Sequence, residues 1–136
     1  LRPIPAFSVL VTCIGTVGNT GLTLVSGATN QQINAICTYT PEHADYLFAY
    51  FNGPVGQSLV IGNASATTLP IINKGDFSAL PVPIPAPEEM LEINRLLAAS
   101  RAGEAERIRL LNDAAVAASA LRQSILTAAF RGELGA

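Results

Sequence analysis

The feature that most constrains this sequence is an uninterrupted helical pattern from Pro87 to Phe130. The stretch has no internal proline, and apolar residues recur in it at spacings of three and four. Pro87 suits the first helical position, where a missing N–H costs nothing. At the rise of an α-helix, the stretch would be roughly 66 Å long, which exceeds the width of a small domain. Part of the helix is therefore expected to project and to need a partner.

The apolar residues of this stretch form a seam of the kind found in coiled coils. Their spacing predicts that they share one face of the helix, with a three-residue step after the alanine-rich middle. The predicted partner surface consists of Leu97, Ile108, Leu111, Ala115, Ala118, Leu121 and Ile125. The competing interpretation is a core helix of an ordinary domain, and the seam does not exclude it.

Two further features of the helix carry expectations about its shape. The segment 100–103 is polar and ends in Gly103, and a glycine inside a helix costs roughly 1 kcal/mol relative to alanine. A kink or short break is therefore expected there. At the far end, Arg131 and Gly132 resemble a last-turn cation followed by a glycine stop.

Charge divides the chain sharply. Residues 1–87 hold only Arg2, Glu42, Asp45, Lys74 and Asp76, and all the other charged side chains lie in residues 88–136. The net charge of −2 gives no general attraction to nucleic acid. The uncharged run from residue 3 to 41 is not a membrane helix, because glycine and amide residues interrupt it.

The weakly charged part alternates strand and helix patterns. Strands are predicted over 8–14, 22–25 and 33–39, the first two joined by a glycine-rich hairpin loop. Thr40 and Pro41 predict the start of a helix that ends before Gly53. A short second helix is expected near 57–61, an extended segment over 67–72 and a turn over 73–76. The sequence thus predicts an α+β fold with a small mixed body over 1–80.

A proline-rich connector follows over residues 81–86, and the long helix occupies 87–131. Because Pro81, Pro83 and Pro85 lack N–H donors, the connector cannot be a central strand. Each proline also fixes its own φ and favours an extended shape for the residue before it. The connector is therefore expected to hold the body at a set angle to the helix.

The few reactive side chains give no catalytic or metal pattern. Cys13 and Cys37 both lie in apolar, strand-like runs, and are read as buried, reduced cysteines of a cytoplasmic protein. His43 lies in a predicted first helical turn, where a solvated surface position is expected. These spacings match no zinc motif, and no cofactor is expected. An enzyme with a cysteine nucleophile is a third, weaker hypothesis, because nothing nearby pairs with either thiol.

Five segments of the chain, taken in order, resemble one known protein family. They are VLVTCIGTVGNTGLTLV, ATNQQINAI, ADYLFAYFNG, TLPIINKGDFSALPVPIPAPEEM and LRQSILTAAFRGEL. The chain resembles the C-terminal portion of a DNA-sequence-specificity subunit of a type I restriction–modification system. Two positions depart from the family pattern: Glu89-Met90 where glutamine is usual, and Cys13 where a polar or basic residue is common.

The resemblance implies a fold and a division of labour. Residues 1–80 would be part of a target-recognition domain, because the family has a substantial segment ahead of this hairpin. Family members pack two such helices antiparallel as a coiled coil, which spaces two recognition domains over a split DNA site. The helices also dock methyltransferase subunits. The specificity subunit is not itself an enzyme, since methyl transfer and cleavage belong to the modification and restriction subunits.

The residues themselves offer few groups for reading DNA. The candidate DNA-binding residues are Thr16, Asn19, Asn30, Gln31, Gln32 and Lys74. Amides suit hydrogen bonding to base edges, but Asn30 and Gln31 are equally suited to satisfying backbone groups in a turn. Lys74 suits either a phosphate or solvent. The alternative function is a helical dimerisation or interaction module whose body binds no DNA.

Overall fold

The computed structural model describes residues 3–65 and 68–133. The chain forms two compact units, one up to Arg95 and one from Leu96 onward. We call the first unit the body and the helical second unit the distal helix. The description leaves out residues 1, 2, 66 and 67 of the body. The start of the predicted extended segment, Thr67, is among them. The finer division at residues 80 and 86 stays a prediction.

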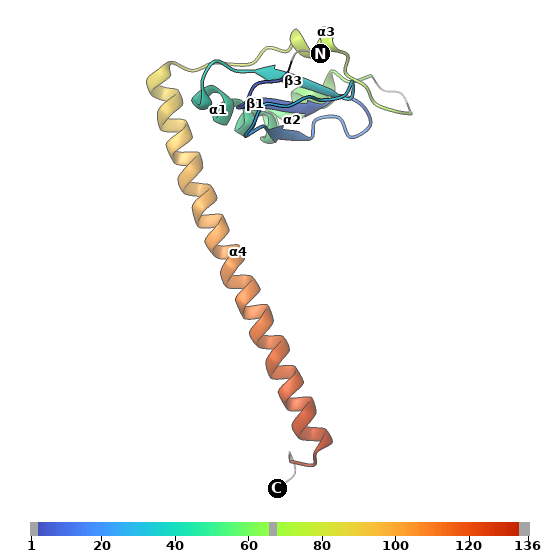
Figure 1. The fold of residues 1–136 in the computed structure, drawn as a ribbon, viewed down its shortest axis with the longest axis vertical. Coiled ribbons are helices and arrows are strands. Elements are labelled where there is room, and N and C mark those ends of the chain that lie inside the picture. Colours follow the sequence, from blue (N-terminus) through green and yellow to red (C-terminus); the bar gives the residue numbers. More distant parts are fainter. Residues whose placement is uncertain (1–2, 66–67, 134–136) are drawn as a thin grey trace. The chain divides into compact units, whose positions relative to one another are not determined.

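The body is built on a three-stranded antiparallel sheet, which together with its helices confirms the α+β class (Figure 1). The strands are β1 (Ser8–Thr12), β2 (Thr20–Leu22) and β3 (Ile33–Cys37), in the order β2-β1-β3. Val9 in the central strand pairs with Leu22 on one side and Ile36 on the other. The sheet therefore has two open edges among the described residues, those of β2 and β3.

The predicted hairpin is present, but its second strand lies earlier than expected. Residues 24 and 25 are not in β2, and Leu24 and Val25 are largely exposed. The β-branched and apolar residues at 22–25 favoured a strand. However, no other element of the described residues packs against Leu24 and Val25. The predicted strand over 8–14 ends at Thr12. The chain then turns through Gly15 and Gly18, whose φ values of 76° and 98° favour glycine.

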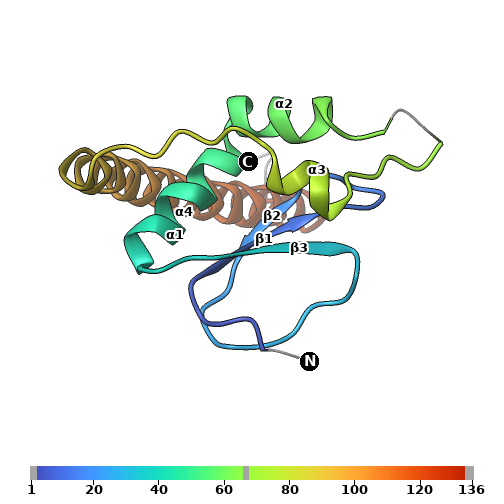
Figure 2. The ribbon, with the colours of Figure 1, turned by 90° about the horizontal axis from the view of Figure 1, so that it is seen from above.

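Two helices, α1 (Pro41–Asn52) and α2 (Pro54–Gly62), accompany the sheet (Figure 2). The core joins Val9 and Val11 of β1 to Leu47 and Phe51 of α1 and Val60 of α2. The sequence predicted α1 correctly at both ends, since Thr40 caps it and Gly53 ends it. Gly53 ends α1 with an extended backbone conformation, at a φ of −76°. The same residue is the N-cap of α2.

The expected turn over residues 73–76 is wrong, because a short helix, α3 (Lys74–Ser78), stands there. Asn73 caps it by accepting a hydrogen bond from the backbone N–H of Asp76 at 2.9 Å. The Asn73 amide in turn donates to the Asp76 carboxylate at 2.6 Å. The cap thus satisfies one backbone N–H of the first helical turn, and Phe77 anchors the helix in the core.

The first turns of α4 (Pro87–Phe130) belong to the body. Met90 is only 3% exposed, and the Asn94 amide donates to the carbonyl oxygen of Glu42 at 2.9 Å. The connector before α4 forms no regular element. It is held to α1 because the Tyr46 hydroxyl donates to the carbonyl oxygen of Pro83 at 2.8 Å.

The expected break at residues 100–103 is wrong, because α4 remains helical through them. An added Cβ at Gly103 would meet nothing within 4 Å. No neighbouring group therefore bends the helix at this glycine, although glycine lowers its local stability. The glycine stop is confirmed. Gly132 has a φ of 73°, and its N–H and that of Glu133 bond back to Ala129 and Ala128, the pattern of a Schellman cap. Arg131 lies just beyond the helix.

Two expectations about reactive side chains also need correction. Cys13 is buried, but Cys37 is exposed, because it ends β3 at an open edge of the sheet. His43 is half-buried rather than solvated. Its Nδ1 lies 2.9 Å from the Thr40 hydroxyl oxygen, which also accepts from the His43 backbone N–H at 3.4 Å. His43 thus belongs to the cap of α1.

Candidate functional site

The six candidate DNA-binding residues, far apart in sequence, come together at one end of the sheet. β1 ends where β2 and β3 begin, so the loops that precede β2 and β3 share this end (Figure 2). The segment before α3 joins them there, since Ile72 donates to the carbonyl oxygen of Cys13 at 3.0 Å. We call this the loop end of the sheet.

Thr16 and Asn19 lie in the β1–β2 loop with exposed side chains. Their backbones hold the loop closed: Thr12 N–H donates to the Asn19 carbonyl at 2.9 Å, and the Thr12 hydroxyl donates to the Thr16 carbonyl. Gln57 of α2 also clamps the loop, because its amide donates to the carbonyl oxygen of Gly18 at 2.7 Å. This role of Gln57 is not predictable from the sequence pattern.

In the amide loop, residues 30–32, one side chain satisfies a backbone group and two side chains are exposed. The Asn30 side-chain oxygen accepts from the backbone N–H of Gln32 at 3.0 Å, so this amide shapes the turn. Gln31 and Gln32 contact the core through their carbonyl oxygens, which lie 3.5 Å from the Cys13 sulfur and 2.8 Å from the Cys13 nitrogen. Their side chains remain exposed.

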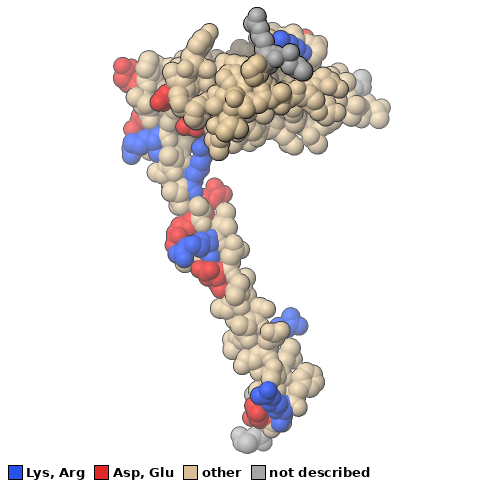
Figure 3. Space-filling model, in the orientation of Figure 1, with Lys and Arg blue, Asp and Glu red and all other residues tan. Residues whose placement is uncertain are grey.

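Lys74 is the first residue of α3 and is exposed. It is the one lysine of the chain. The visible face of the body carries few charges, whereas clusters of both signs stand along α4 (Figure 3). The loop end thus offers exposed amides, a hydroxyl and one cation, which can hydrogen-bond base edges or phosphates.

The described residues contain neither a metal-binding cluster of three or more His, Cys, Asp or Glu side chains nor a helix long and apolar enough to cross a membrane. The clear pKa shifts of acidic groups have local causes. A hydrogen bond from Thr40 lowers the pKa of the Glu42 carboxyl. Hydrogen bonds from Arg95 and Arg109 lower the pKa of Glu92 and Glu106, respectively.

The predicted partner surface lies on the distal helix, where its large side chains are exposed. Leu111 is 69% exposed and Leu121 is 63% exposed. Ile108, Ala115, Ala118 and Ile125 are also exposed, and Leu97 is half-buried. Burying one such leucine or isoleucine stabilises by about 1.5–3 kcal/mol. The described part of the chain therefore leaves most of this surface uncovered.

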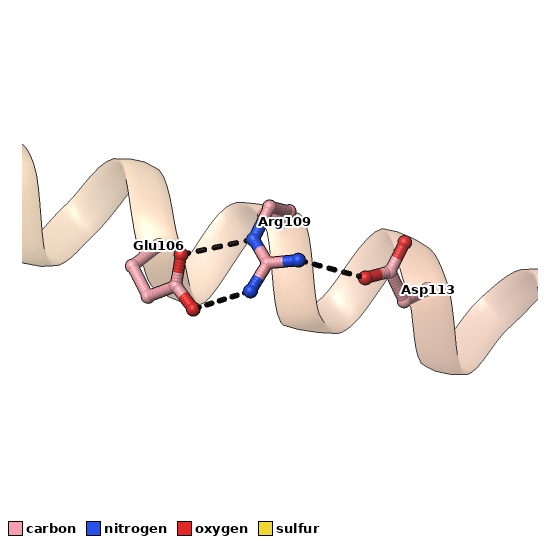
Figure 4. Close-up of polar contacts among 3 residues, drawn as sticks. All are labelled: Glu106, Arg109 and Asp113. Atoms are coloured by element: carbon pink, nitrogen blue, oxygen red, sulfur yellow. Dashed lines mark hydrogen bonds and ion pairs between the residues drawn. The ribbon is translucent and has the colours of Figure 1, made fainter.

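Charged side chains of the distal helix pair with one another away from the seam. Arg109 donates two hydrogen bonds to Glu106, at 2.9 and 2.6 Å, and lies 3.5 Å from Asp113 (Figure 4). At about 100° per residue, Arg109 and Asp113 face nearly opposite to Leu111. Such exposed pairs contribute little to stability, because solvent screens them. This charged trio therefore lies on the side of the helix opposite Leu111.

Comparison with known proteins identifies the family. No family model matches the chain, but three curated proteins do. The chain is 31% identical over 133 residues to the Type I restriction enzyme EcoBI specificity subunit of Escherichia coli, a match that covers 94% of the chain. The chain is related to the specificity subunits of type I restriction enzymes.

Two further specificity subunits agree. The EcoDI subunit of Escherichia coli is 43% identical over 72 residues, 53% of the chain. The HindI subunit of Haemophilus influenzae (strain ATCC 51907 / DSM 11121 / KW20 / Rd) is 33% identical over 86 residues, 62% of the chain. The chain spans 28%, 16% and 19% of the lengths of these three relatives. It therefore corresponds to a segment of a specificity subunit.

Proposed function

We propose that this chain forms part of a subunit that recognises a specific DNA sequence for a type I restriction–modification complex in the cytoplasm. The match to specificity subunits over 94% of the chain is the observation that carries the proposal. In it, the body supplies part of a target-recognition domain, and the chain itself performs no catalysis. Methyl transfer and cleavage belong to the modification and restriction subunits.

Within this proposal, the loop end of the sheet faces double-stranded DNA. Asn19, Gln31 and Gln32 expose amide side chains there, and amides can bond base edges in the major groove. Asn30 shapes the turn that presents the two glutamines. Lys74 and Thr16 suit phosphate contacts, which position a protein on DNA without reading its sequence.

The distal helix docks protein partners in this proposal. The apolar seam through Leu111 would pack against a helix of another recognition half or a second copy, and against methyltransferase subunits. Few cations support DNA affinity: Lys74 and Arg2 stand against three acids in residues 1–87. Because each phosphate contact adds about one unit to the salt dependence of binding, this chain alone should bind DNA poorly.

Filter binding tests the proposal. The polypeptide encoded by the reading frame that contains this sequence would be titrated with DNA that the methyltransferase modifies. The titration would be made with and without the methyltransferase subunit, and residues 1–136 alone would be titrated in parallel. We expect sequence-specific binding by the assembled complex and weak, salt-sensitive binding by residues 1–136. A complex that assembles but shows no preference for any DNA sequence would support the interaction module instead.

A further inference from the structure

The second open edge of the sheet, that of β3, has backbone groups free to pair with another strand. The backbone N–H of Cys13 donates to the Gln32 carbonyl at 2.8 Å, so these two residues form a hydrogen-bonded pair. Hydrogen-bonded and non-hydrogen-bonded pairs alternate along an antiparallel ladder. The backbone N–H groups of Asn34 and Ile36 therefore bond to β1. The N–H groups of Ala35 and Cys37 therefore point away from the sheet, where no strand of the described residues pairs with them.

A trough of about 590 Å³ follows this same edge. It is lined by the four consecutive residues 33–36 of β3, and successive strand residues face opposite sides of a sheet. A hollow that touches all four must therefore run along the edge itself. A second, smaller hollow shares Ile36, Leu47 and Ile84 with it and reaches Tyr39, which is 98% exposed.

The far wall of the trough is apolar and has a two-residue period. It is lined by Leu80 and, within the connector, by Val82 and Ile84, with prolines between them. Every second residue of this wall is apolar, and every second side chain of an extended strand points to the same side. A strand lying in the trough could therefore pack its side chains against these residues. The volume lies in the usual range of binding clefts, roughly 300–1,000 Å³, and so admits a backbone with several side chains.

One polar atom in the trough lacks a partner. The side-chain nitrogen of Asn34 is buried and has no hydrogen-bond partner among the described residues, although Asn34 lines the trough. Leaving a buried donor unsatisfied is unfavourable, because the group has lost its hydrogen bonds to water. An acceptor on an incoming chain, such as a carbonyl or carboxylate oxygen, would remove this cost.

We propose that the β3 edge and its trough receive an extended strand from the part of a specificity subunit that this chain does not cover. The strand would pair with Ala35 and Cys37, place apolar side chains at alternate positions in the trough, and offer an acceptor to Asn34. The source follows from length, because the chain spans 28% of the EcoBI subunit. This inference rests on the proposed function, since it assigns the strand to the same recognition domain.

Amide hydrogen exchange tests the strand site directly. Residues 1–136 would be mixed with overlapping synthetic peptides that tile the uncovered parts of the three relatives, and exchange would be followed by NMR. We expect at least one peptide to slow exchange at Ala35 and Cys37 by about tenfold or more. Asn34 and Ile36 should change little, because β1 already protects them. The same peptide should slow alkylation of the exposed Cys37 thiol.

Matched variants separate strand pairing from mere proximity. Ala35→Pro removes an outward N–H that β1 does not use, a substitution that edge strands tolerate, whereas Ala35→Ser keeps that N–H. Protection should be lost in Ala35→Pro and kept in Ala35→Ser. If no peptide protects the wild-type edge amides, or if binding survives Ala35→Pro unchanged, the inference is wrong. Should Ala35→Pro fail to fold, the wild-type exchange pattern decides the same question: strand pairing requires protection at Ala35 and Cys37 that is absent at Asn34 and Ile36, and uniform protection would overturn it.

The two proposals fail in different experiments. The exchange measurement contains no DNA, and the filter-binding measurement does not report on the β3 edge. Protection at Ala35 and Cys37 without any sequence preference in DNA binding would keep the strand site and overturn the proposed function. Sequence-specific DNA binding without protection would overturn the strand site alone.

Discussion

The side-chain amide of Gln57 donates a hydrogen bond to the carbonyl oxygen of Gly18 at 2.7 Å, across 39 positions of sequence. The same nitrogen donates to the carbonyl oxygen of Phe51. Gln57 therefore ties α2 and the end of α1 to the β1–β2 loop. This tie fixes the backbone that presents Thr16 and Asn19 at the loop end of the sheet.

Gln57→Ala should destabilise the body and loosen this loop. The change removes the hydrogen bonds to the carbonyl oxygens of Gly18 and Phe51, although the Thr20 hydroxyl still donates to Gly18. A typical hydrogen bond contributes about 0.5–1.5 kcal/mol to stability. Urea unfolding would measure the loss, and faster amide exchange at Gly18 and Asn19 would show the loosening. Asn63→Ala is the control, because the Asn63 side-chain amide bonds to Leu59 within its own turn and to nothing else among the described residues. Equal stability of the two variants would contradict the clamp.

Gly56→Ala should also destabilise the body. A Cβ at residue 56 would lie 2.2 Å from the Tyr50 carbonyl oxygen and 2.8 Å from the Phe51 Cα, so α1 and α2 would have to separate. Overpacking of this kind costs about 1–3 kcal/mol. Gly62→Ala is the control in the same helix, since nothing lies within 4 Å of its added Cβ. A Gly56→Ala midpoint in urea at or above that of wild type would rule out the close contact.

These contacts show where sequence reasoning reaches its limit. The ends of α1 were predictable, because Thr40, Pro41 and Gly53 mark them locally. The β1–β2 hairpin and the extent of α4 followed from pattern in the same way. The roles of Gln57 and Gly56 were not predictable, because both depend on which segments meet in space.

The errors have equally specific causes. Residues 73–76 read as a turn because Asn, Gly and Asp favour turns, yet the Asn73–Asp76 pair caps a helix instead. Cys37 read as buried because β3 is apolar, but pattern alone does not say which strand lies at an edge. The six candidate DNA-binding residues were chosen singly, and the sheet brings them to one end. Whether they bind DNA stays a prediction.

Leu111→Asp on the distal helix should abolish self-association or docking of the methyltransferase. The change places a charge within the apolar seam, where burial of the leucine would otherwise stabilise by about 1.5–3 kcal/mol. Val116→Asp is the matched control, because Val116 is also exposed but faces away from Leu111 at about 100° per residue. Sedimentation velocity would report both effects. Unchanged mass and unchanged methyltransferase binding for Leu111→Asp would show that the seam is assigned wrongly.

Replacing Pro81, Pro83 and Pro85 with glycine should weaken DNA binding and relax the preference for half-site spacing. Glycine removes the φ restriction that each proline imposes in the segment between α3 and α4. Tyr46 would keep its bond to the carbonyl at residue 83, which is a backbone group, so the body should stay folded. The measurement is the affinity of the assembled subunit for DNA sites with altered spacers. Wild-type affinity and spacer preference would mean that the prolines only separate α3 from α4.

We expect the loop end of the sheet to read DNA for a methyltransferase. The most direct test maps methylated positions in DNA from cells that express the modification subunits with either the wild-type polypeptide or Asn19→Ala/Gln31→Ala/Gln32→Ala. Each base contact contributes about 1–3 kcal/mol of discrimination. The triple variant should therefore lose or shift methylation at one half-site while subunit assembly persists. Ser26→Ala, exposed at the opposite end of the sheet, should methylate as wild type does. Identical methylated positions and extents for the triple variant and the wild type would contradict the account.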